Sequence, residues 1–278
     1  MALLRLVHPF PSALNALLVL GIALIAGAPI QRAGLLAVAM LGLQFCIGAV
    51  NDLFDEALDA ESKPFKPIPG GSVSRRAAWL VAGVCGGGGL ALAALANPPD
   101  QLSLAMAAAM LAAGLVYDAV LKPTAFGWLC FAIAFPILPI YAWYGATGDL
   151  PPRWEILVPV ATLAGLALQL SNGLVDLETD RAAGLRTLAV ALGRRKSLTL
   201  VAIAVVAIHL LAGITQPAAQ AEAAALAVAL LSGMAGALAL GGLIASAQSA
   251  RVMREIGWSA QAASIAVLAL GWLLGSAG

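Results

Sequence analysis

The feature that most restricts the fold of this chain is a series of apolar stretches, each long enough to cross a lipid bilayer. A helix of about 20 apolar residues spans the hydrocarbon core of a membrane. The 278 residues are 62% hydrophobic and 10% charged, which is typical of a polytopic membrane protein. We expect nine transmembrane helices, at residues 12–30, 33–53, 76–96, 101–117, 124–146, 155–176, 197–214, 221–247 and 258–276.

The basic residues distinguish the two sides of the predicted membrane domain. Of the 15 lysines and arginines, 13 lie in the N-terminal segment or in the loops that follow the even-numbered helices. Because cytoplasmic loops carry the excess of Lys and Arg, these loops and the N-terminus are predicted to be cytoplasmic. The net charge of +1 gives no indication of a nucleic-acid partner. We expect residues 1–278 to form one integral membrane domain.

A pattern of one asparagine and two aspartates, spaced four residues apart, occurs twice at the predicted cytoplasmic ends of helices. Spacing of four keeps side chains on one face of an α-helix, so each trio is expected to form one stripe about three turns tall. The copies lie 121 residues and four predicted helices apart, which indicates a repeated helical unit. The two copies are Asn51-Asp55-Asp59, with an additional Asp52, and Asn172-Asp176-Asp180.

Carboxylates at such positions favour a function over a structural role. A charged residue near the bilayer centre costs roughly 2.5–3.5 kcal/mol on insertion scales, so two matched stripes require a compensating partner. Mg²⁺ prefers a few carboxylates together with phosphate oxygens and water. Two facing stripes would bind Mg²⁺ and a diphosphate, whose charge grows as a carbon–oxygen bond breaks. The alternative is a transporter that moves a cation or metabolite along the intramembrane carboxylates.

Basic residues beside both copies favour the diphosphate over a bare cation pathway. The candidates that would contact an anion are Lys63, Lys66, Lys122, Arg181 and Arg186. The alternative explanation for these basic residues is membrane topology alone, since Lys and Arg are expected in cytoplasmic loops. The loop 63–71 contains three prolines and a glycine pair, which predicts either a lid over the site or a rigid connector.

Taken together, these motifs resemble the UbiA-type intramembrane prenyltransferase superfamily. The resemblance comes from Asn51 to Asp59, from Asp176 and Asp180 with the following segment 181–188, and from Tyr117 ahead of Lys122. It implies that Mg²⁺ and the donor diphosphate are held by Asn51, Asp55, Asp59, Asp176 and Asp180. It also implies that Asp52 supports these ligands, and that Lys122, Tyr117 and Arg186 contact the diphosphate or position the acceptor. The Tyr117–Lys122 spacing is five, whereas many relatives have four.

The segment 117–154 is rich in aromatic residues and is expected to form part of the apolar wall for a prenyl chain. Phe131 and Phe135 are predicted to line a cavity or to pack between helices, whereas outer aromatic residues are expected in an interfacial belt. The belt candidates are Tyr141, Trp143, Tyr144 and Trp154. The glycine run 86–89 lacks the following Lys-Ser/Thr of a nucleotide loop and indicates close helix packing, as do Gly233 and Gly236.

These observations predict an all-α polytopic membrane protein, with nine transmembrane helices around a central cavity and two four-helix-related repeats. The expected activity is Mg²⁺-dependent transfer of a prenyl group from a polyprenyl diphosphate to a lipophilic acceptor, with an aromatic acceptor as the first expectation. The expected catalytic residues are Asp55, Asp176, Lys122 and Arg186. The expected substrate-binding residues are Asn51, Asp52, Lys63, Lys66, Tyr117, Asn172, Arg181, Phe131 and Phe135.

Overall fold

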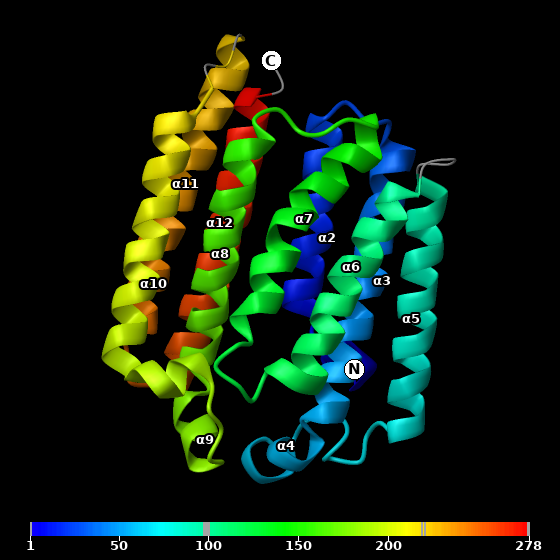
Figure 1. The fold of residues 1–278 in the computed structure, drawn as a ribbon, viewed down its shortest axis with the longest axis vertical. Helices are drawn as coiled ribbons and strands as arrows, with labels where there is room; N and C mark the ends of the chain where they lie inside the picture. Colours follow the sequence, from blue (N-terminus) through cyan, green and yellow to red (C-terminus); the bar gives the residue numbers. More distant parts are fainter. Residues whose placement is uncertain (1, 97–100, 218, 220, 277–278) are drawn as a thin grey trace. The chain divides into compact units, whose positions relative to one another are not determined.

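The computed structural model describes residues 2–96, 101–217, 219 and 221–276, and confirms that the chain is all-α (Figure 1). Each of the nine predicted stretches contains a helix. Eight helices in the described part of the chain are long and apolar enough to cross a membrane, while the first is a shorter apolar helix of 17 residues. The nine are α2 (Pro9–Ile25), α3 (Ile30–Phe54), α5 (Arg75–Ala96), α6 (Leu102–Val116) continued by the π-helix η1 (Tyr117–Leu121), α7 (Trp128–Thr147), α8 (Trp154–Val175), α10 (Leu188–Thr215), α11 (Glu222–Ser246) and α12 (Arg251–Ser276).

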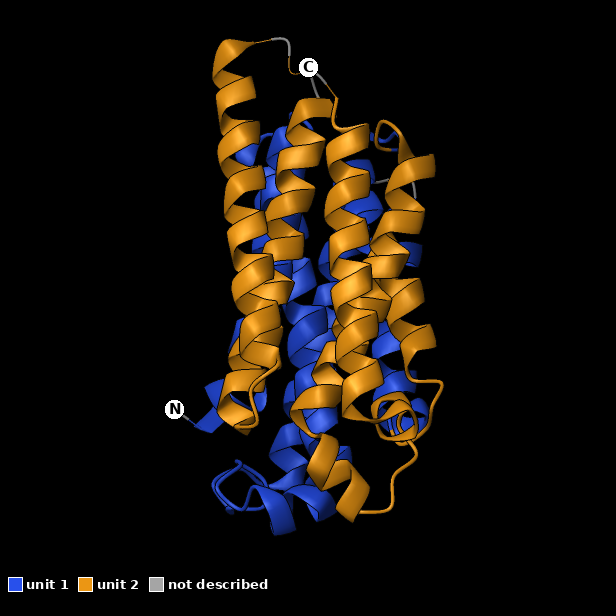
Figure 2. Cartoon of the chain, turned by 90° about the vertical axis from the view of Figure 1, so that its left-hand side faces the viewer, with its two compact units in different colours: residues 1–122, 137–150 blue, residues 123–136, 151–278 orange. Residues whose placement is uncertain are grey.

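Three short helices complete the described part of the chain, and two of them directly follow a long helix. They are α1 (Ala2–Leu6), α4 (Glu56–Ser62) after α3, and α9 (Leu177–Ala182) after α8. The chain divides into two compact units, drawn in different colours in Figure 2. Unit 1 comprises residues 1–122 and 137–150, and unit 2 comprises residues 123–136 and 151–278. Each unit therefore contains one copy of the aspartate motif, and the boundary within α7 falls directly after Pro136.

Helix packing in unit 1 depends on small residues at the seam between α3 and α5. A Cβ atom on Gly89 would lie 2.8 Å from the Ala39 carbonyl oxygen, and one on Gly86 would lie 2.9 Å from Cys46 Sγ. These two glycines confirm the predicted close packing, because any side chain would push the helices apart. Gly87 and Gly88 face open space and have no such role.

In unit 2, α12 packs against α11 and α8, and α10 packs against α8. The prediction that Gly233 and Gly236 mediate close packing is wrong, since a Cβ atom on either would have nothing within 4 Å. The close approach is made by Gly242 instead, where a Cβ atom would lie 3.0 Å from the Gly257 carbonyl oxygen. The buried core beside α8 consists of Leu170, Leu174, Leu177, Ala189, Val201, Val205 and Ala239.

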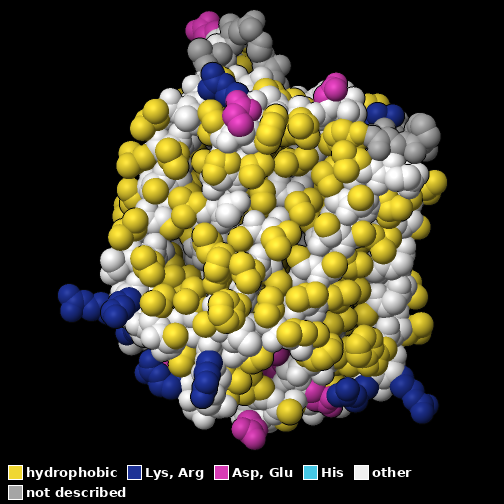
Figure 3. All heavy atoms as spheres, in the orientation of Figure 1, with side chains coloured by type: hydrophobic (Ala, Val, Ile, Leu, Met, Phe, Trp, Pro, Cys, Tyr) yellow, Lys and Arg dark blue, Asp and Glu magenta, His cyan; other side chains and the backbone are white. Residues whose placement is uncertain are grey.

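Apolar side chains cover much of the face drawn in Figure 3. Large exposed hydrophobic residues such as Ile214, Leu230 and Leu80 suit contact with lipid. The predicted aromatic belt is wrong for two of its members. Tyr141 is completely buried and its hydroxyl donates to the Leu36 carbonyl oxygen at 3.4 Å, while Trp143 is only 7% exposed. Packing between helices, and not the membrane interface, determines their positions.

Candidate functional site

Both aspartate motifs lie at an interruption between two helices, and the interruption falls at the middle residue of the trio each time. Asp55 separates α3 from α4, and Asp176, with φ −103° and ψ 13°, separates α8 from α9 (Figure 1). The prediction of one continuous helical stripe is therefore wrong. Bonds with four-residue spacing persist nearby, since Asp59 N donates to Asp55 O and Asp180 N donates to Asp176 O, each at 2.8 Å. The interruption suits aspartate, whose side chain competes for backbone hydrogen bonds and disfavours helix interiors.

In unit 1, Lys66 joins two buried aspartates of the first motif. Its Nζ donates to Asp52 Oδ1 at 2.8 Å and to Asp59 Oδ2 at 2.6 Å. Asp52 also contacts His8 Nε2 at 3.0 Å, and Lys63 Nζ lies 3.9 Å from Asp59 Oδ1. Burial by itself lowers the pKa of Lys66, but the two carboxylates raise it above its ordinary value. The loop 63–71 is thus attached to the motif through an ammonium group.

The loop 63–71 is also folded on itself. Gly70 N donates to Lys66 O at 2.9 Å, Gly71 N donates to Ile68 O at 3.0 Å, and Gly71 has a φ of 69°, which favours glycine. Ile68 and Val73 are buried.

His8 was not among the predicted site residues, because nothing in the sequence relates it to Asp52, a carboxylate 44 residues away.

Asp55 and Asn51 are held by residues from η1 and its end. Lys122 Nζ donates to Asp55 Oδ2 at 2.5 Å, and Asn51 Nδ2 donates to Asp118 Oδ1 at 2.9 Å. Burial acts to lower the pKa of Lys122, but Asp55 and the neighbouring groups raise it above its ordinary value. Asp118 is only 5% exposed. Like His8, it was not among the predicted site residues.

The π-helix explains the unusual spacing of Tyr117 and Lys122. Lys122 N donates to Tyr117 O at 2.8 Å, which is a hydrogen bond across five residues. In a π-helix, residues five apart are related by one turn, as residues four apart are in an α-helix. The extra residue is absorbed by this turn, so that Tyr117 and Lys122 keep a one-turn relationship.

In unit 2, the second motif is paired with arginines from the start of α12. Arg251 binds Asp176 Oδ1 through Nε at 3.1 Å and through Nη2 at 2.8 Å, and Arg254 forms an ion pair with Glu178. Neither arginine was a predicted site residue, since both were explained by topology. The sequence feature that could have identified them is that their loop lies on the predicted cytoplasmic side, as the second motif does.

The other predicted residues of unit 2 lie around this motif with fewer contacts. Arg181 and Arg186 have exposed side chains, and Asn172 is partly exposed. Arg186 N donates to Pro123 O at 3.0 Å, which attaches the segment after α9 to the segment ahead of α7. Asp180 also accepts from Leu185 N through its backbone oxygen at 3.0 Å.

The donor types of the first motif suit a hard divalent cation. Carboxylate and amide oxygens are what Mg²⁺ binds, and it uses only one or two carboxylates when phosphate oxygens and water complete its shell. Within the described residues, no group of three or more His, Cys, Asp or Glu side chains is arranged to hold a metal alone. Asp52 Oδ2 and Asp118 Oδ2 are buried without a hydrogen-bond partner among these residues. Such acceptors fit a further cationic or donor group.

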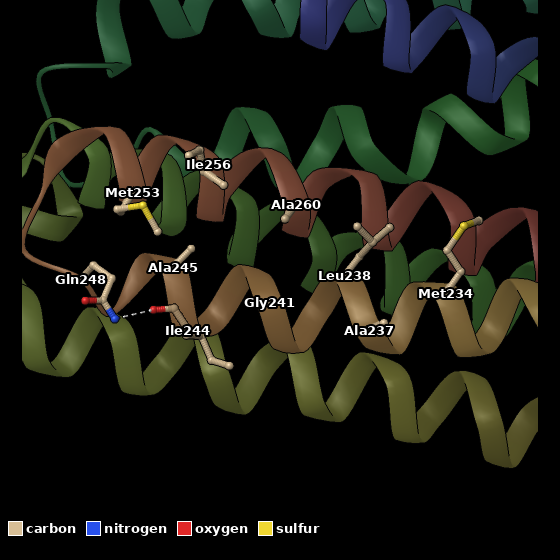
Figure 4. Close-up of a pocket in the computed structure, with 10 residues that line it drawn as sticks. All are labelled: Met234, Ala237, Leu238, Gly241, Ile244, Ala245, Gln248, Met253, Ile256 and Ala260. Carbon is tan, nitrogen blue, oxygen red and sulfur yellow. Dashed lines mark hydrogen bonds between the residues drawn. The ribbon is translucent and has the colours of Figure 1, made fainter.

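An apolar groove of about 800 Å³ lies between α11 and α12 in unit 2 (Figure 4). Phe131 and Phe135, which were predicted to line a cavity or to pack, do not contribute to it. They stack on each other on α7 with ring centroids 5.8 Å apart, and the backbone at Phe131 approaches Gly165 of α8 closely. The groove is lined by Met234, Ala237, Leu238, Gly241, Ile244, Ala245, Gln248, Met253, Ile256 and Ala260.

Comparison with known proteins gives consistent matches over most of the chain. It is 32% identical to digeranylgeranylglyceryl phosphate synthase of Methanopyrus kandleri over 212 residues, which is 76% of both proteins. It is 30% identical to the chloroplastic chlorophyll synthase of Arabidopsis thaliana over 154 residues, which is 52% of this chain and 39% of that protein.

Among solved structures, the fold is similar to that of a UbiA homologue from Archaeoglobus fulgidus bound to DMAPP and Mg²⁺. The TM-score is 0.69 and the sequence identity 20%, with 99% of both chains covered. This likeness concerns the fold. The characteristic sequence of the UbiA prenyltransferase family matches residues 13–260, a range that contains both aspartate motifs and the helices that carry them. The chain therefore belongs to the UbiA prenyltransferase family.

Proposed function

We propose that this integral membrane protein is a Mg²⁺-dependent prenyltransferase. It transfers a prenyl group from a polyprenyl diphosphate to a lipophilic acceptor within the membrane and releases diphosphate. The observation that carries the proposal is the repeated arrangement of an aspartate at a helix interruption with a basic side chain bound to it, Asp55 with Lys122 and Asp176 with Arg251. The relatives named digeranylgeranylglyceryl phosphate synthase and chlorophyll synthase support it.

Mg²⁺ would be held by the oxygens of both motifs, from Asn51, Asp55, Asp59, Asp176 and Asp180. When bound, the metal supplies positive charge that stabilises the departing diphosphate. In unit 1, Lys66 forms ion pairs with Asp52 and Asp59, and Lys122 forms one with Asp55. Their ammonium groups are therefore placed to bind a diphosphate beside the motif, and Lys63, Tyr117, Arg181 and Arg186 are further candidates for contact with either substrate.

In the proposed reaction, the carbon–oxygen bond of the donor breaks and its electron pair leaves with the diphosphate. The nucleophilic atom of the acceptor forms a bond to the same carbon, and the acceptor loses a proton to water or to the released diphosphate. The residues of this chain orient the donor through its diphosphate, and holding both reactants in place contributes through proximity.

The acceptor is proposed to be lipophilic, and two acceptor classes are worth testing first. The 32% identical relative is named for a glyceryl phosphate that carries two geranylgeranyl groups, whereas the aromatic class remains the sequence-based expectation. Incubating the purified protein with donors of several chain lengths and with each acceptor class, followed by mass spectrometry of the products, separates the two classes. We further propose that residues 1–278 act as one domain, with the N-terminus and both motifs on the cytoplasmic side.

Single substitutions in each motif test this function. Asp55→Ala and Asp176→Ala should each abolish Mg²⁺-dependent diphosphate release while the protein stays folded, with losses of about 100-fold or more. Asp149→Ala, in an exposed loop, is the matched control and should leave the rate unchanged. Wild-type turnover in either motif variant refutes the assignment. Metal-dependent flux of a solute into liposomes without any prenylated product would show a transporter instead.

A further inference from the structure

The first turn of α12 carries two arginines that both reach the interruption between α8 and α9. Arg251 binds Asp176 Oδ1, and Arg254 Nη2 donates to the Val175 carbonyl oxygen at 3.3 Å and pairs with Glu178. Residues three apart in a helix lie on the same face, so α12 directs both guanidinium groups to one place. Arg251 contacts Asp176, a predicted metal ligand. Arg254 instead contacts Val175 and Glu178, which lie on either side of Asp176 in the chain.

The Val175 carbonyl needs a donor because the helix stops there. The last four carbonyl groups of an α-helix have no partner within the helix, and α8 ends at Val175. Arg254 supplies an N–H to this carbonyl, and the residue as a whole is only 3% exposed. A buried arginine of this kind is held by its planar fork of donors, which a lysine cannot reproduce.

Arg254 thereby joins three segments of unit 2. Its Nη1 donates to Ser249 O in the loop ahead of α12, and its Nη2 contacts the end of α8 and the first turn of α9. Glu178 lies between Asp176 and Asp180, and its side chain is 60% exposed while that of Arg254 is 4% exposed. The buried arginine is therefore the more fixed member of the pair, and it connects the first turn of α9 to the end of α8.

We propose that Arg254 is a positioning residue for the second aspartate motif. It holds the interruption between α8 and α9 in the conformation in which Asp176 and Asp180 bind Mg²⁺, without touching the substrate or the metal itself. The inference rests on the proposed function, because it assigns Arg254 to the metal site named there. A purely structural anchor would affect the stability of the protein but not the affinity of the motif for a metal ion.

Mn²⁺ binding to the purified full-length protein, measured by electron paramagnetic resonance without substrate, tests the proposal. The component lost in Asp176→Ala defines binding by the second motif. Arg254→Gln should weaken this component by about 10–100-fold, in the range typical of groups that orient metal ligands, and Arg254→Lys should restore only part of the affinity. Thermal unfolding of each variant shows whether it is folded.

Arg194 provides the matched control, because it donates to Ala247 O and Gln248 O in the same loop but does not contact the motif. Arg194→Gln should leave Mn²⁺ binding unchanged. Glu178→Gln removes the negative charge of the exposed partner of Arg254 but keeps an acceptor oxygen. This variant should fold even where Arg254→Gln does not, and should weaken the same component to a smaller extent.

Two outcomes distinguish a failure of the proposed role of Arg254 from a failure of the proposed prenyltransferase function. If wild-type protein shows Asp176-dependent Mn²⁺ binding, and the folded Arg254 and Glu178 variants show the same affinity, Arg254 does not position the motif and the proposed function stands. If wild-type protein shows no Asp176-dependent binding, the metal assignment of the second motif is wrong, and the role of Arg254 falls with it.

Discussion

Asn51 Nδ2 donates a hydrogen bond to Asp118 Oδ1 over 2.9 Å, between residues 67 positions apart in the chain. Because Nδ2 is the donor in this bond, the amide nitrogen of Asn51 faces Asp118. The amide oxygen of Asn51 therefore points away from Asp118, and we expect it to be the atom that meets a cation. Asp118 thus determines whether Asn51 presents an oxygen or a nitrogen at the first motif.

Replacement of Asp118 by leucine should lower the rate of diphosphate release by about 10–100-fold, because the Asn51 amide loses the group that orients it. Asp118→Asn should keep more of the rate, since an amide oxygen can still accept from Asn51. The Mg²⁺ concentration at half-maximal rate should rise with Asp118→Leu. Val120→Leu, an exposed position in the same turn, is the control. Equal Mg²⁺ dependence in all three variants would contradict this role.

Lys66→Met should destabilise the protein by about 3–5 kcal/mol when divalent cations are absent, because it leaves Asp52 and Asp59 buried without their shared cation. Added Mg²⁺ should raise the unfolding temperature of Lys66→Met more than that of the wild type, since the metal can replace the missing charge. Lys196→Met, at an exposed position, should respond to Mg²⁺ like the wild type. A Lys66→Met protein that is insensitive to Mg²⁺ would show that these carboxylates do not bind it.

Gly89→Ala should destabilise the protein by about 1–3 kcal/mol, because the new methyl group would lie 2.8 Å from a backbone oxygen of α3. Gly88→Ala, one position earlier and facing open space, should be neutral or stabilising by up to about 1 kcal/mol. Thermal unfolding in detergent measures the difference. Equal melting temperatures for the two variants would mean that α3 and α5 are not in close contact at Gly89.

Deletion of Ala119 should convert the π-turn into an ordinary α-helical turn, since it removes the one extra residue that the turn contains. Tyr117 and Lys122 would still be one turn apart, so the deleted protein should stay folded and keep measurable diphosphate release. Deletion of Ala105, within the regular part of α6, should abolish activity because it rotates the following residues out of register. The prediction fails if the Ala119 deletion is the more harmful of the two.

The positions of the helices could be predicted from the sequence because a membrane span needs only local information. A run of about 20 apolar residues is helical in lipid whatever the rest of the chain does, and each predicted stretch contains a helix. The spacing of Asn51, Asp55 and Asp59 likewise identified a polar site without any knowledge of its partners. Both are properties of short segments.

The partners of these residues depend on contacts between distant parts of the chain, and no local pattern predicts them. Lys122 and Asp55 are 67 residues apart, and Arg251 and Asp176 are 75 apart. The helix interruptions at Asp55 and Asp176 could not be predicted from the sequence either, because the four-residue spacing typical of a helix continues through both motifs. Sequence alone therefore determined which segments are long and apolar enough to cross a membrane and which carboxylates form the motifs. Only the tertiary structure decided where those helices stop and which lysine or arginine pairs with Asp55, Asp59 and Asp176, since packing brings those charges together.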